Sequence, residues 1–110
     1  MTDQVKAGVT DPADVLAPHR DRLDAMDEQI LGLLTARMRV CLDIARLKAR
    51  HGIPMMQPER VGLVVARARA HAAAHGLPEE FLADVFQRVI DETCAREDAL
   101  IAELTREESR

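Results

Sequence analysis

The sequence has 110 residues, 47% of them hydrophobic and 31% charged, which suits a single folded domain and excludes an intrinsically disordered chain. Its formal net charge of -4 argues against a nucleic-acid partner, because nucleic-acid binding requires a basic face. No segment approaches the roughly 18 consecutive apolar residues of a membrane span. Residues 1–11 lack the apolar core of a signal peptide, so we expect a cytoplasmic protein that does not bind membranes.

The composition predicts an all-α fold. Aromatic residues make up only 2% of the chain, and the apolar residues are mostly Ala, Leu, Val, Ile and Met. Ala, Leu and Met favour helices, and an aliphatic core of this size is small for a monomer. Cys41 and Cys94 both fall within helical patterns, which indicates two buried thiols rather than a disulfide.

The first predicted helix begins at Asp11, a good N-cap, followed by Pro12, which suits the first helical position. Pro18 either kinks this helix or marks its true start. Apolar residues then recur at helical spacings of three and four. They are Leu23, Met26, Ile30, Leu33, Leu34, Val40, Cys41, Ile44 and Leu47. Gly52 has the position of a C-terminal cap.

The length of this first helix favours a homodimer. Residues 18–51 would extend about 50 Å as a helix, whereas a compact chain of this size has a radius of gyration of about 13 Å. A single chain cannot cover such a helix, but the same helix of a second chain can. We therefore expect the long first helices to pair.

Two shorter segments complete a three-helix chain. Pro58 opens the second helix, which stops at Gly76, and Pro78 precedes the third. The predicted organisation is a disordered or frayed N-terminus, a helical domain and a charged tail, at residues 1–11, 12–105 and 106–110.

Polar residues interrupt the apolar faces of two helices. Arg37 and Lys48 are eleven residues apart, about three helical turns, so both point along the buried face. Thr93 and Glu97 form an i,i+4 pair within the apolar stripe of the third helix. Buried cations require anions. Either the protein supplies them, for example by pairing Lys48 with Glu97, or an anionic ligand occupies a pocket between the helices.

Two further arginines bear on such a pocket. Arg20 is seventeen residues before Arg37 and therefore about 100° away around the helix, so it cannot readily reach the same pocket in its own chain. In an antiparallel dimer, it could reach the pocket of the partner chain. Arg60 is in the first turn of the second helix, where the loop returns the chain toward the first.

The order and spacing of these residues resemble the all-helical class of chorismate mutases, over about residues 16–104. The resemblance is carried by Arg-Asp-Arg-Leu-Asp-Ala-Met-Asp at 20–27, Leu-Leu-Thr-Ala-Arg at 33–37, Ile-Ala-Arg-Leu-Lys at 44–48, Pro-Glu-Arg-Val at 58–61 and Phe-Gln-Arg-Val-Ile at 86–90. It implies three helices per chain in an intertwined homodimer, and conversion of chorismate to prephenate by a Claisen rearrangement. It implies no metal, no cofactor and no covalent intermediate.

The resemblance also implies the substrate-binding and catalytic residues. Each of two sites would take Arg37, Lys48, Arg60, Thr93 and Glu97 from one chain and Arg20 from the partner. Arg20 and Arg37 would bind the side-chain carboxylate, and Arg60 the ring carboxylate, of a small dicarboxylate substrate. Lys48 would donate to a carboxylate and to the ether oxygen. Glu97 would face that oxygen in its protonated form.

The sequence departs from the chorismate pattern near the substrate ring. Gln57 and Val61 stand where chorismate enzymes often carry acids. With the runs at 55–61 and 94–98, this resembles the branch that acts on 4-amino-4-deoxychorismate in antibiotic pathways to p-aminophenylalanine. Gln57 and Val61 are thus expected to contact the substrate ring. The alternatives are chorismate mutase, isochorismate pyruvate lyase and, outside catalysis, a helical dimerisation module.

Overall fold

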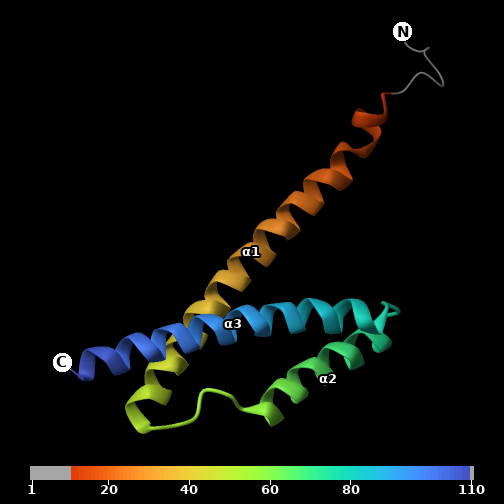
Figure 1. Ribbon diagram of the computed structural model, residues 1–110. Coiled ribbons are helices and arrows are strands. Elements are labelled where there is room, and N and C mark those ends of the chain that lie inside the picture. The colour runs from red at the N-terminus through yellow and green to blue at the C-terminus, as the bar shows by residue number, and fades with distance from the viewer. Residues whose placement is uncertain (1–10, 110) are drawn as a thin grey trace. The chain divides into compact units, whose positions relative to one another are not determined.

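The computed structural model describes residues 11–109 and confirms the all-α prediction, with three helices and no strand in that range (Figure 1). The helices are α1 (Pro12–His51), α2 (Pro58–Ala74) and α3 (Glu79–Glu108). The chain divides into two units, one ending at Arg37 and the other beginning at Met38, so α1 contributes to both. The prediction for the N-terminus lies outside the described residues, apart from residue 11.

The start of α1 follows from its capping residue. The Asp11 carboxylate oxygen Oδ1 accepts a hydrogen bond from the backbone N–H of Ala13 at 2.9 Å. The Asp11 carbonyl also accepts the N–H groups of Asp14 and Val15. Pro18 lies inside the helix. The alternative in which Pro18 marks the start of the helix is therefore excluded. Capping satisfies backbone donors that the first turn would otherwise leave unpaired.

Within the first unit, the apolar face of α1 is exposed. All residues from 11 to 36 are exposed, and the large apolar side chains among them retain between 42% and 70% of their surface. We call five of these side chains the N-terminal stripe: Leu23, Met26, Ile30, Leu33 and Leu34. An apolar stripe of this kind is the usual sign of a surface that another chain covers.

In the second unit, both interhelical breaks occur at glycines. Gly52 ends α1 with a positive φ of 65°, and the N–H of Ile53 donates to the Lys48 carbonyl at 2.9 Å. α2 ends in the same way at Gly76, with φ of 72°. These are the cap conformations that the sequence predicts, and glycine adopts them without steric cost. Ala45 is fully buried one turn before Lys48, so Lys48 lies on the buried face of α1.

α2 and α3 form an antiparallel hairpin (Figure 1). Its interior contains Val65, Ala83 and Ile90, against which Val61, Val64 and Cys94 pack. We call the first three residues the α2–α3 core cluster. The cluster combines small and branched side chains, which lets the two helices approach closely. The core therefore holds α3, and the polar residues it carries, in a defined orientation against α2.

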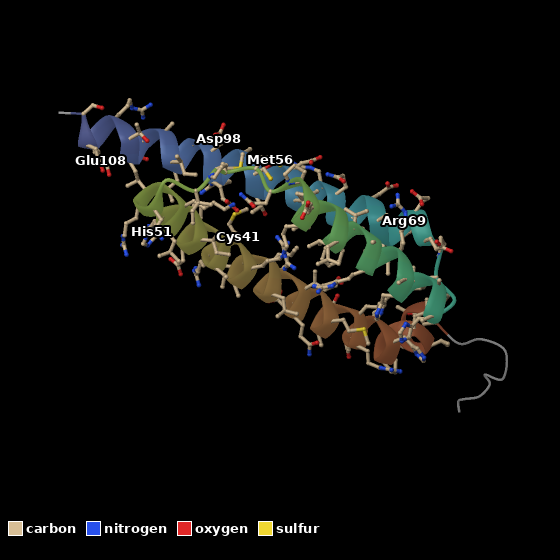
Figure 2. The ribbon with its side chains drawn as sticks, turned by 90° about the horizontal axis from the view of Figure 1, so that it is seen from below. Cys41, His51, Met56, Arg69, Asp98 and Glu108 are labelled. Atoms are coloured by element: carbon tan, nitrogen blue, oxygen red, sulfur yellow. The ribbon has the colours of Figure 1, made fainter. Side chains whose placement is uncertain are left out.

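An exposed ion pair joins the two helices near their shared turn. The Arg69 guanidinium donates from Nε to Glu80 Oε2 at 2.9 Å and from Nη2 to Oε1 at 3.2 Å (Arg69 is labelled in Figure 2). Hydrogen bonding to Arg69 and its positive charge lower the pKa of Glu80 below its ordinary value. The forked geometry restricts the register of the hairpin, although exposed pairs add little stability.

The third helix extends into the segment that the sequence assigns to a charged tail. α3 ends at Glu108, beyond the expected domain boundary at 105. The N–H of Ser109 donates to the carbonyls of Thr105 and Arg106, and the positive charge of Arg106 suits the helix C-terminus. None of the helices in residues 11–109 has the length and apolarity that crossing a bilayer requires.

Candidate active site

The centre of the candidate site is a buried ion pair between α1 and α3. Lys48 Nζ donates to Glu97 Oε1 at 3.1 Å and to the backbone carbonyl of Met55 at 2.8 Å. The side chains of Lys48 and Glu97 are only 14% and 8% exposed. The structure thus brings together two of the residues expected at the site and joins them to the α1–α2 loop. The sequence left open whether the protein or an anionic ligand neutralises the buried cations. For Lys48, the protein supplies the counter-ion, which is Glu97.

Thr93 lies one turn before Glu97 on the same face of α3. Its side chain is buried, with 5% of the residue exposed, and its hydroxyl donates to the Val89 carbonyl at 2.8 Å. A hydroxyl group can both donate and accept hydrogen bonds. Thr93 and Glu97 are the two buried polar residues of the described chain, which makes this face of α3 chemically distinct.

A thiol adjoins the ion pair. Burial raises the pKa of the Cys94 thiol, and the negative charge of Glu97 raises it further, while the positive charge of Lys48 opposes them. Cys94 is therefore a neutral, partly buried group beside the charged pair. The sequence indicates its burial but not this neighbourhood, although its position three residues before Glu97 offers the signal. Cys41 and Cys94 form no disulfide, as expected.

Gln57 has a role within the loop. Its side-chain Nε2 donates to the Pro54 carbonyl at 2.9 Å, and its backbone carbonyl accepts the N–H groups of Arg60 and Val61. Gln57 is thus the N-cap residue of α2, immediately before Pro58. The sequence predicts a substrate contact at this position and does not reveal the bond to the loop backbone.

The other expected residues differ in their surroundings. Arg60 is exposed in the first turn of α2, whereas Val61 is partly buried against the α2–α3 core cluster. Arg20 and Arg37 belong to the first unit, where Arg20 is exposed and Arg37 is half-buried. Lys48, Thr93 and Glu97 therefore form the buried part of the site that the second unit contains.

This arrangement can stabilise charge without supplying a nucleophile. A lysine ammonium has three N–H donors, and two of them are used by Met55 and Glu97. The third remains for an anion or an oxygen on which negative charge grows. In residues 11–109, no group of three or more His, Cys, Asp or Glu side chains is arranged to hold a metal ion.

Comparison with known proteins places the chain in a family. Residues 19–98 match the model of the family described as chorismate mutase type II. The chain belongs to this family, which confirms the resemblance seen in its sequence motifs, and it is an enzyme of the isomerase class.

The relatives include two enzymes with a more specific name. A 4-amino-4-deoxychorismate mutase from Streptomyces pristinaespiralis is 44% identical over 96 residues, covering 87% of this chain and 72% of the relative. The enzyme of that name from Streptomyces venezuelae is 45% identical over 93 residues, covering 83% and 90%. A chorismate mutase from Methanocaldococcus jannaschii is 31% identical over 88 residues, covering 80% and 89%.

Proposed function

We propose that this enzyme rearranges 4-amino-4-deoxychorismate to 4-amino-4-deoxyprephenate, a step toward p-aminophenylalanine in antibiotic biosynthesis. Its similarity to the two Streptomyces mutases, each more than 40% identical, carries this proposal. The buried Lys48–Glu97 pair supports it, because a Claisen rearrangement needs oriented charge and no nucleophile. The catalytic domain corresponds to residues 12–105.

Lys48 stabilises the transition state. The carbon–oxygen bond of the enolpyruvyl ether breaks as a carbon–carbon bond forms within the same molecule, and negative charge grows on the ether oxygen. The remaining N–H of the Lys48 ammonium donates to this oxygen. Because Lys48 is only 14% exposed, water screens this interaction weakly.

Arginines hold the two carboxylates of the substrate. Arg37 and the partner's Arg20 bind the side-chain carboxylate, Arg60 binds the ring carboxylate, and Thr93 accepts or donates a further hydrogen bond. Forked guanidinium–carboxylate bonds fix the side chain over the ring and so reduce the entropic barrier. The supply of Arg20 in trans requires an intertwined homodimer. The N-terminal stripe, which is exposed in the single chain, would be buried against its counterpart in such a dimer.

Product analysis with three substrates tests the proposal. The protein is incubated separately with 4-amino-4-deoxychorismate, chorismate and isochorismate, and the products are separated by chromatography. We expect the rearranged 4-amino acid, formed with a higher kcat/KM than prephenate from chorismate. Prephenate formed at the higher kcat/KM would favour the chorismate mutase alternative, which the Methanocaldococcus relative supports. Release of pyruvate would indicate a lyase. No turnover of any of the three substrates would favour the alternative of a non-catalytic dimerisation module.

The negative charge of Glu97 should influence the rate. Its carboxylate, 3.1 Å from Lys48 Nζ, would repel the charge that grows on the ether oxygen, whereas a protonated carboxyl could donate to that oxygen. We expect kcat to be higher at acidic than at alkaline pH, and Glu97→Gln to make the profile flat. The measurement is kcat against pH for both proteins. An alkaline optimum that Glu97→Gln leaves unchanged would contradict this role.

A further inference from the structure

We propose that Gln57 is a positioning residue that orients the Lys48 ammonium through the α1–α2 loop. In this proposal, Gln57 does not contact the substrate ring. This inference rests on the proposed function, because it concerns how the catalytic lysine of that reaction is held. The sequence suggests that Gln57 contacts the substrate ring, whereas its hydrogen bond to Pro54 supports a role in positioning Lys48.

Three successive contacts connect Gln57 to the ion pair. Gln57 Nε2 donates to the carbonyl of Pro54 at 2.9 Å, and Pro54 is covalently joined to Met55. The Met55 carbonyl accepts from Lys48 Nζ at 2.8 Å, and the same Nζ donates to Glu97 at 3.1 Å. The side chain of Gln57 therefore closes the loop segment 54–57 on itself and holds the carbonyl that Lys48 needs.

The start of α2 fixes one end of the loop segment 54–57. The backbone carbonyl of Gln57 accepts the N–H groups of Arg60 and Val61, so the residue is fixed as the N-cap of a packed helix. Val61 packs against the α2–α3 core cluster, which gives that helix a rigid support. The packed α2–α3 hairpin therefore determines, through Gln57 and the loop segment 54–57, where the Met55 carbonyl lies.

The physical consequence concerns the direction of one N–H bond. A lysine side chain is flexible, and its ammonium can rotate freely unless acceptors hold it. Two fixed acceptors, Met55 and Glu97, leave one N–H with a defined direction. Without the Met55 carbonyl, the ammonium would be held by Glu97 alone, and its remaining donors would rotate. A donor that must reorganise during the reaction stabilises the transition state less well.

The kinetic test uses Gln57→Met, which keeps the length of the side chain but removes its amide. Gln87→Met is the matched control, because Gln87 Nε2 makes an equally short exposed hydrogen bond to Asp91, also 2.9 Å. We expect Gln57→Met to lower kcat by about 3- to 10-fold, the size of one hydrogen bond, with KM changed less than about twofold. The loss should be equal for 4-amino-4-deoxychorismate and chorismate. Gln87→Met should retain the kcat of the original enzyme.

A second measurement observes the lysine without any reaction. The sequence has two lysines, Lys6 and Lys48, so Lys6→Arg assigns the side-chain ammonium signals in a ¹H–¹⁵N NMR spectrum. We expect the Lys48 ammonium protons to exchange slowly with water in the original protein and in Gln87→Met. In Gln57→Met, they should exchange several-fold faster, because the loop no longer holds the Met55 carbonyl in place as their acceptor.

Each outcome separates this inference from the proposed function. A change in the ratio of kcat/KM between the two substrates would overturn the inference, because Gln57 would then read the ring substituent. An unchanged kcat or an unchanged Lys48 exchange rate in Gln57→Met would also overturn it. If the original protein turns over neither substrate, the proposed function fails, and the exchange rates alone decide whether Gln57 orients Lys48.

Discussion

Replacing Lys48 with methionine is expected to reduce kcat/KM by at least about 10³-fold, the effect of losing a charged donor at a developing oxyanion. The variant also leaves the Glu97 carboxylate, 8% exposed, without its cation. Removing one member of a buried ion pair lowers the free energy of unfolding by about 3 kcal/mol. Lys48→Met should therefore be both inactive and less stable, as measured by steady-state kinetics and by denaturant unfolding.

A second substitution separates the two effects. The double variant Lys48→Met with Glu97→Leu removes the unpaired carboxylate, so we expect most of the stability to return while activity stays lost. Arg46→Met is the control, because its ion pair with Asp43 also lies on α1 but is exposed. It should change stability by less than about 0.5 kcal/mol and leave kcat unchanged. Full activity of Lys48→Met would remove Lys48 from the mechanism.

Charges placed in the N-terminal stripe are expected to abolish both dimerisation and activity. In Ile30→Glu with Leu33→Glu, the proposed dimer would have to bury two carboxylates between its first helices, and burying unpaired charges is costly. Sedimentation velocity should show a monomer of about 12 kDa. Activity should fall by more than about 10²-fold, because each site loses the partner's Arg20. A dimer that persists with full activity would contradict the arrangement.

Two controls examine the shared site directly. Leu31→Glu introduces the same charge at an apolar residue that is also exposed but lies about 100° from Ile30 around the helix, so it should leave the dimer intact. Mixing Arg20→Ala with Lys48→Met, each nearly inactive alone, should restore about a quarter of the activity after subunit exchange. Half of the dimers are then mixed, and each mixed dimer has one intact site. No recovery on mixing would place Arg20 and Lys48 of each site in one chain.

Local chemistry allowed much of the fold to be predicted from the sequence. Asp11 caps α1, glycines with positive φ end α1 and α2, and Pro58 begins α2, because capping and steric limits act over a few neighbouring residues. Helical periodicity likewise predicted that Lys48 and Glu97 lie on buried faces. At Pro18, the local rules left two outcomes open, and the continuous helix decides between them.

By itself, the sequence determined the helices, their ends and the residue types available to the site, since each of these depends on short-range geometry. Only the tertiary structure decided that Lys48 bonds to both Glu97 and the Met55 carbonyl, and that Gln57 turns its amide back to Pro54. Residues 48 and 97 are far apart along the chain, and a backbone carbonyl carries no signal in a sequence. Such bonds exist because the packing of α2 on α3 brings the loop and the two helices to one point.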